Sequence, residues 1–257
     1  MQRPVLKSTS ITNENFADVT YHIEGSLTPV LTVEIGSQSV FFEHHVMLWK
    51  STQLETTTAR LKGGFKRLIA GMPIILLHAK GEGQIAFSRN GPGQIYPIHL
   101  EPGDEIDVRE HQYLAATENL EYTYSRVKGL RNSMMGGSGF FIDKFRANND
   151  SGVLWLHAFG NTFEKVLADG EQIDVEVGSW VYKDPEVKME TRMQRLSTGL
   201  MATASGSSIV CNRFTGPGRV GIQSCSMDLL MGDSDASSAA TGGFLGGLLG
   251  EMLSPKR

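Results

Sequence analysis

The chain has 257 residues and a net charge of −4, from 24 Lys and Arg against 28 Asp and Glu. Hydrophobic residues make up 40% of it, and 29 glycines bring the apolar share to roughly half, as in globular domains. This composition excludes disorder over most of the length. The acidic balance lacks the basic footprint of a protein that binds nucleic acid non-specifically, so no nucleic-acid partner is expected.

The sequence carries no pattern typical of export or membrane insertion. Residues 1–20 contain neither an apolar signal-peptide core nor an Arg-rich amphipathic pattern. No apolar run approaches the ~20 residues that cross a bilayer as a helix. The two cysteines are too few for a disulfide-dense secreted scaffold. These features predict a soluble, cytoplasmic protein.

In chain order, the predicted elements are β-strands separated by tight turns. Residues 27–42 alternate apolar and polar side chains, as in strands with one buried face. The continuous apolar runs 74–79 and 153–158 are typical of strands buried on both faces. Residues 102–104 (Pro-Gly-Asp) and 168–170 (Ala-Asp-Gly) have turn chemistry. The pattern predicts an all-β fold of the jelly-roll or β-sandwich type.

Short motifs recur along the chain and predict internal repeats. Leu100–Val108 and Leu167–Val175 share the pattern L-x-x-G-acid-x-I-D-V, and Val33–Ser37 resembles Val175–Ser179. We therefore expect about three related units. They cover roughly residues 21–95, 96–161 and 162–228 of a single β domain, 1–230.

The repeats lead to definite structural expectations. Gly103 and Gly170 should occupy equivalent turns. Val33, Val108 and Val175 should lie on equivalent strands.

Four polar residues within the repeats also have predicted surroundings. His78 and His157 each precede Ala inside an apolar run, so we expect them at equivalent positions, buried and structural, with a hydrogen bond to the ring. Asp107 and Asp174 recur between Ile and Val. Because those apolar neighbours face the core, the two carboxylates are expected to face solvent.

The segment Glu43-His44-His45 contains good metal-ligand types. It supports an alternative hypothesis of a cupin-like, small-molecule or metal-dependent enzyme centred on His44 or His45. Adjacent residues on a strand point to opposite faces, however, so the two imidazoles would not share an ion. A third ligand at the cupin spacing is missing. We therefore expect no metal, no cofactor and no catalytic residue.

Three further segments have simpler interpretations. Cys211 and Cys225 are placed symmetrically about Gly218, so the thiols would face each other if the flanking strands formed a hairpin; a wider connection is the other option. The basic segment 60–67 is expected to be a solvated loop. The glycine-rich segment 134–139 lacks a phosphate-loop ending and is expected to be a flexible loop.

The C-terminus differs in composition from the rest. Residues 231–257 are predicted to be a flexible Gly/Ser/Ala-rich tail containing a short apolar segment, 242–253. The segment is too rich in glycine to be helical in water, so it should form a helix only when docked on the core, a subunit or a membrane. Its apolar residues on one helical face are Phe244, Leu245, Leu248, Leu249 and Met252.

A set of motifs in fixed order resembles a known family. The motifs are V-E-I-G-S at 33–37, H-H-V-M-L-W-K at 44–50, L-x-P-G-D at 100–104, A-D-G-E-Q-I-D-V-E-V-G at 168–178, K-M-E-T at 188–191 and R-F-T-G-P-G-R-V-G-I-Q-S at 213–224. Over roughly residues 20–228, the chain is similar to the altered inheritance of mitochondria protein 24 family. The resemblance implies β-sandwich units like that of tryptophan RNA-binding attenuation protein, repeated around a pseudo-threefold axis. It implies no catalytic residues, and it links mitochondrial members to inner-membrane organisation and respiratory-complex integrity.

The leading functional hypothesis is a non-enzymatic structural or interaction module. Repeated β units leave sheet edges and apolar surface that another copy often covers, so a self-associating homo-oligomeric scaffold is expected. Besides a second copy of the chain, a different protein or a membrane surface could be the partner. Alongside the cupin-like enzyme, a membrane-peripheral protein using residues 242–253 is the second alternative.

Overall fold

A computed structural model describes residues 3, 5–6, 11–58, 76–89, 91–127, 140–195 and 208–226. Every element within these ranges is a β-strand, which confirms the all-β prediction. In the described ranges, no helix is long and apolar enough to cross a membrane. The predictions for 60–67, 134–139 and 231–257 fall outside the described residues.

The strands form three consecutive units of six, preceded by β1 (Val5–Leu6), β2 (Ile11–Phe16) and β3 (Val19–Glu24). Unit 1 contains β4 (Val30–Ile35), β5 (Val40–Glu43), β6 (Met47–Lys50), β7 (Glu55–Thr58), β8 (Leu76–Lys80) and β9 (Gly83–Phe87). Unit 2 contains β10 (Gly93–Leu100), β11 (Glu105–Arg109), β12 (Tyr113–Thr117), β13 (Leu120–Val127), β14 (Phe140–Ala147) and β15 (Gly152–Phe159). Unit 3 contains β16 (Thr162–Leu167), β17 (Gln172–Glu176), β18 (Trp180–Lys183), β19 (Lys188–Arg195), β20 (Ser208–Thr215) and β21 (Gly218–Gln223).

All three units share one pattern of antiparallel strand pairing. The sixth strand pairs with the first and the third, and the fifth pairs with the second and the fourth. The ladder between third and sixth strands also shifts register at the same place in each unit. These shifts lie between Met47 and Trp49, Tyr113 and Ala115, and Trp180 and Tyr182. By strand pairing, the units span residues 30–87, 93–159 and 162–223.

The glycine prediction agrees with these pairings. Gly103 and Gly170 both lie in the turn from first to second strand, with φ of 97° and 70°. In each turn, the carboxylate of the following residue, Asp104 or Glu171, accepts a 2.9 Å hydrogen bond from the backbone N–H three residues earlier. The repeated motif thus encodes the same turn twice.

Two other predicted equivalences do not agree with the pairings. Val108 and Val175 lie on second strands, β11 and β17, but Val33 lies on a first strand, β4. His78 lies on a fifth strand, β8, whereas His157 lies on a sixth strand, β15. The matching strings are short and alternate in polarity, so they suit any strand with one buried face and do not identify its place in the unit.

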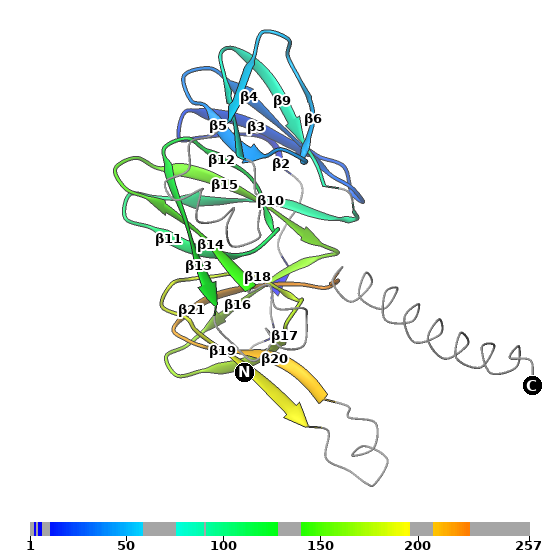
Figure 1. Cartoon of the computed structure of the whole chain (residues 1–257), viewed down its shortest axis with the longest axis vertical. Helices are drawn as coiled ribbons and strands as arrows, with labels where there is room; N and C mark the ends of the chain where they lie inside the picture. Colours follow the sequence, from blue (N-terminus) through cyan, green and yellow to red (C-terminus); the bar gives the residue numbers. More distant parts are fainter. Residues whose placement is uncertain are drawn as a thin grey trace, which may run out of the picture.

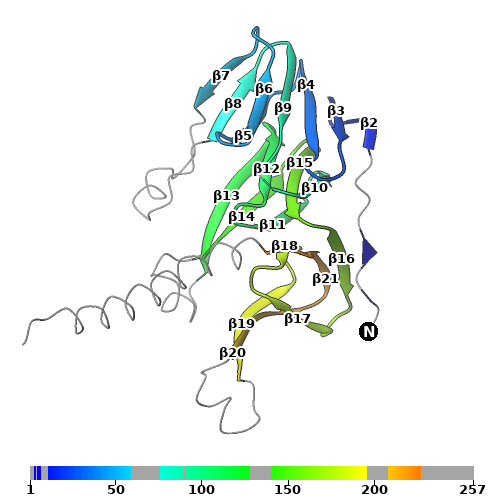
Figure 2. The ribbon, with the colours of Figure 1, turned by 90° about the vertical axis from the view of Figure 1, so that its right-hand side faces the viewer.

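The units join by sheet extension. Strand β5 of unit 1 pairs with β12 of unit 2, and β11 of unit 2 pairs with β18 of unit 3. The joined sheets have the orders β10-β15-β12-β5-β8-β7 and β1-β16-β21-β18-β11-β14-β13. Figure 1 shows the three units following one another along the long axis, and Figure 2 shows the same succession from the side. No described strand of unit 1 pairs with unit 3, so the threefold axis stays a prediction.

The hydrophobic core is shared between neighbouring units. The cluster of unit 1 includes Leu114 and Trp155 of unit 2, and the cluster of unit 2 includes Val181 of unit 3. Side-chain sizes are complementary at the register shift, where a large residue on one strand faces a small one on the other. The facing pairs are Trp49 and Ala86, Ala115 and Trp155, and Tyr182 and Gly221. The large residue lies on the third strand in units 1 and 3 and on the sixth strand in unit 2.

The strands that flank Gly218 do not form a hairpin. Strand β20 pairs with β17 and β19, while β21 pairs with β16 and β18 in a different sheet. The predicted option of facing thiols is therefore wrong, and the connection is the wider one. Cys211 and Cys225 are free and half-buried.

We predict that Gly221→Ala destabilises the fold. A Cβ at Gly221 would contact the ring atoms of Tyr182, which is fully buried and has little room to move. Overpacking of this kind costs about 1–3 kcal/mol in the free energy of unfolding. Urea unfolding followed by circular dichroism measures it. Gly36→Ala is the control, because a Cβ there has no neighbour within 4 Å. Equal unfolding free energies for both variants would contradict the packing argument.

Candidate functional site

A buried ionic group lies at the junction of units 2 and 3. Asp107 on β11 contacts Lys144 of its own unit and Lys183 of unit 3, each at 2.7 Å between Nζ and a carboxylate oxygen. The side chains of Asp107 and Lys183 are only 6% and 7% exposed. The expectation that Asp107 faces solvent is wrong, because β18 covers this position. Its repeat counterpart Asp174 remains 37% exposed and pairs with Arg213.

A second ionic group lies near the junction of units 1 and 2. Glu43, at the end of β5, contacts Arg89 at 3.3 Å, and their side chains are 2% and 9% exposed. Burial lowers the pKa of Arg89, while the negative charges of Glu43 and Asp143, from unit 2, raise it. Carboxylates from two units therefore stabilise the positive charge of this guanidinium.

The two adjacent histidines lie in the turn between β5 and β6, and not on a strand as predicted. Their ring centroids are 5.4 Å apart, at an interplanar angle of 77°. His45 Nε2 lies 3.3 Å from Glu43 Oε2 and 3.4 Å from Arg89 Nη2. Burial lowers the pKa of His45 to about 4, together with the positive charges of Arg89, His44 and His111.

This arrangement is unfavourable for a metal cation. A guanidinium beside His45 repels positive charge, and the carboxylate of Glu43 already pairs with that guanidinium. Across the described ranges, no group of three or more His, Cys, Asp or Glu residues could hold a metal ion. The groups form an ionic junction with the exposed imidazoles of His44 and His45 at its edge.

His157 belongs to the same region and is only 1% exposed. Burial lowers its pKa to about 4, assisted by the positive charge of Arg89. The neutral ring also packs edge-on against Phe159, with 5.0 Å between centroids. The prediction that His157 is buried is therefore confirmed, and its structural role stays a prediction. His78 is less buried and contacts Glu118 at 3.4 Å.

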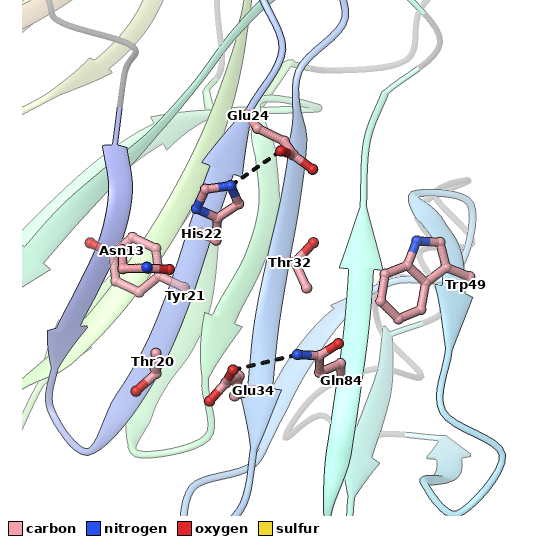
Figure 3. A pocket seen from close by; sticks show the side chains of 9 residues that line it. All are labelled: Asn13, Thr20, Tyr21, His22, Glu24, Thr32, Glu34, Trp49 and Gln84. Carbon is pink, nitrogen blue, oxygen red and sulfur yellow. Dashed lines mark hydrogen bonds and ion pairs between the residues drawn. The ribbon is translucent and has the colours of Figure 1, made fainter.

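An open groove of about 370 Å³ lies on the face of the sheet β2-β3-β4-β9-β6. Figure 3 shows His22 beside Glu24 and Gln84 beside Glu34, with Trp49 at the side of the groove. These contacts measure 3.3 and 3.4 Å and are exposed to solvent. The lining offers hydrogen-bonding groups and the aromatic rings of Tyr21 and Trp49. The Tyr21 hydroxyl donates to Glu14 Oε2 at 2.6 Å and lies 2.9 Å from His99 Nε2, and burial raises its pKa, which keeps it protonated.

Sequence reasoning found only part of these groups. It singled out Asp107 through the repeated motif and His45 through its residue type. It missed Arg89, Lys183 and the groove, because no local motif marks residues that meet through strand pairing between units. The recurrence of aspartate at positions 107 and 174 was the signal in the sequence that could have predicted a cation paired with each carboxylate.

Comparison with known proteins agrees with the observed architecture. Residues 21–225 match the family described as mitochondrial biogenesis AIM24. The chain belongs to this family. A protein of Streptococcus pyogenes solved by X-ray crystallography is similar over 85% of this chain and 99% of its own, with a TM-score of 0.65 and 20% identity. At that identity the likeness shows the fold alone, and no curated protein matches the sequence.

We predict that Arg89→Met lowers the free energy of unfolding by about 3–5 kcal/mol, because it removes a buried guanidinium that pairs with the buried Glu43 carboxylate. Adding Glu43→Gln should recover part of the loss, because the buried negative charge that Arg89 offset is then removed. Chemical denaturation of the three proteins measures both effects. Arg192→Met is the control, since Arg192 forms an exposed ion pair worth at most about 1 kcal/mol. Similar losses at both arginines would contradict the prediction.

A pH-dependent contribution from His157 is also expected. Its folded-state pKa lies below the unfolded value near 6.5, so the unfolded chain binds a proton first as the pH falls. Stability is therefore complete above about pH 6.5 and declines toward pH 4, by at most about 3 kcal/mol. His157→Gln should flatten this decline.

Glutamine is a suitable replacement, because Gln223 occupies the position of unit 3 that is equivalent to His157. The backbone N–H of His157 and that of Gln223 each donate a 2.8 Å hydrogen bond to a backbone oxygen in the turn before the third strand of their unit. Unfolding free energies of both proteins between neutral and mildly acidic pH give the comparison. Parallel pH curves would show that His157 contributes nothing.

Proposed function

We propose that the chain is a non-enzymatic structural module that self-associates as a scaffold. The observation that supports this is a difference between equivalent residues at the register shift of the third strand. At this register shift, Leu114 of unit 2 and Val181 of unit 3 are fully buried, whereas the equivalent Leu48 of unit 1 is 53% exposed. The neighbouring Trp49 is 46% exposed.

An exposed apolar strand edge is a common site of association between chains. Burial of a large apolar side chain contributes about 1.5–3 kcal/mol. Leu48 and Trp49 together therefore offer a useful share of the free energy of a weak interface. The ionic groups of the chain serve the same purpose in this proposal, because they hold units together and do not act on a substrate.

The proposal also covers the compartment, the oligomeric state and the partners of the protein. It acts in the cytoplasm as a homo-oligomer, without a nucleic-acid partner, in keeping with its acidic charge and sparse cysteines. The cupin-like alternative is disfavoured by Arg89 beside His45. The membrane-peripheral alternative depends on residues 242–253, and flotation with liposomes of the full chain and of a chain lacking 231–257 tests it.

Light scattering coupled to size exclusion tests self-association. Over a roughly hundredfold range of concentration, we expect the mass to rise above the 28.1 kDa of one chain. Leu48→Gln should reduce this rise. Val166→Gln is the matched control, because Val166 is 63% exposed but lies on β16, away from the edge formed by β6. A mass of one chain at every concentration would overturn the proposal.

A further inference from the structure

The two internal junctions follow one rule. The second strand of a unit pairs with the third strand of the next unit, as β5 with β12 and β11 with β18. Both pairings are antiparallel. Each junction extends a three-stranded layer of one unit into the neighbouring unit.

One second strand, β17, and one third strand, β6, take part in neither internal junction. Among the described strands, β17 pairs only with β20, and β6 pairs only with β9. Both are edge strands of their sheets. Figure 1 shows them at opposite ends of the molecule, with β6 in the upper part and β17 in the lower part.

We propose that β17 of one copy pairs with β6 of a second copy, so that unit 3 is followed by unit 1 as units 1 and 2 are followed by their neighbours. The occupant of each edge is therefore this chain itself. The inference rests on the proposed self-association and specifies its surfaces and register.

The junction of units 2 and 3 provides the template. There, Val108 lies opposite Tyr182 and Asp107 lies opposite Lys183. Asp107 is held between Lys183 and Lys144, the residue opposite it on its own fifth strand. One carboxylate thus binds a cation from each of the two units.

Strand β17 repeats one side of this template. Asp174 lies opposite Arg213 on the fifth strand, as Asp107 lies opposite Lys144. Arg213 donates two hydrogen bonds of 2.7 Å to Asp174. Val175 follows, as Val108 follows Asp107. The cation of the next unit is the component that a second copy would supply.

Strand β6 carries that component. After the shared register shift, Trp49 and Lys50 occupy the positions of Tyr182 and Lys183. The inferred register therefore places Val175 opposite Trp49, and Asp174 opposite Lys50. Lys50 Nζ donates to the backbone oxygen of Leu54 at 2.6 Å, and an ammonium has further protons for a carboxylate.

The exposed fractions of equivalent residues differ in the direction that the proposed pairing requires. The Asp107 side chain is 6% exposed, whereas that of Asp174 is 37% exposed. Leu48 would enter the position in which Leu114 and Val181 are fully buried. The two edges thus match in backbone pairing, charge and apolar surface.

The surfaces involved are different on the two copies. Such a heterologous contact produces rings when its rotation closes and open filaments when it does not. The pairing therefore predicts assembly beyond a dimer as concentration rises, because every added copy leaves one edge of each kind.

Charge-reversal variants test the pairing. Asp174→Lys and Lys50→Asp should each raise the apparent dissociation constant by roughly tenfold or more in light scattering. Mixing the two variants should restore association, since each keeps the edge that the other has lost. Asp150→Lys, an exposed change in the turn between β14 and β15 of unit 2, should have no effect. Thermal unfolding verifies that each variant is folded.

Cysteine cross-linking tests the register independently of charge. In a chain with Cys211→Ser and Cys225→Ser, one preparation carries Asp174→Cys and the other Lys50→Cys. Directly opposite residues of antiparallel strands lie within disulfide distance, so mild oxidation should yield a covalent dimer. Gln84→Cys replaces Lys50→Cys in the control, because Gln84 is exposed on the neighbouring strand β9.

The outcomes separate the two proposals. A wild-type protein that stays a single chain overturns both. A protein that associates, but whose association is unaffected by charge reversal and whose cross-linking is equal at Lys50→Cys and Gln84→Cys, overturns the pairing of β17 with β6 and leaves self-association standing.

Discussion

Antiparallel pairing between the second strand of one unit and the third strand of the next is the interaction on which this structure depends. It satisfies backbone groups that an edge strand leaves exposed, and it encloses the residue at the register shift. It also explains the buried charge of Asp107. A carboxylate without a cation would be too costly there, and the pairing brings Lys183 to it.

The shifted pKa values of Arg89, His45 and His157 are explained by the junction of units 1 and 2. Strongly shifted pKa values in a protein often mark a catalytic site, but structural ion pairs shift them as well. Arg89 and His157 are buried while His45 is partly exposed, and the positive charge of Arg89 accounts for part of both histidine shifts. The groove beside Trp49 contains exposed polar groups, with ordinary solvated contacts.

The predictions from sequence succeeded where a motif encodes its own conformation. Gly103 and Gly170 agree with expectation because a positive φ requires glycine and the following carboxylate closes the turn locally. The predictions for Val33 and His78 failed because an alternating string only states which face is apolar. Any strand of the unit satisfies that condition, and the order of strands within a sheet is not written in it.

The sequence by itself determined the all-β class and the chemistry of the turns at Gly103 and Gly170. Only the tertiary structure decided that Asp107 is buried between two lysines while Asp174 remains partly exposed. Both aspartates occur in the same local pattern and both face away from their own apolar neighbours. What differs is whether another strand hydrogen-bonds alongside, and backbone hydrogen bonds are nearly independent of side-chain identity, so the neighbour of a strand is set by the packing of the whole chain.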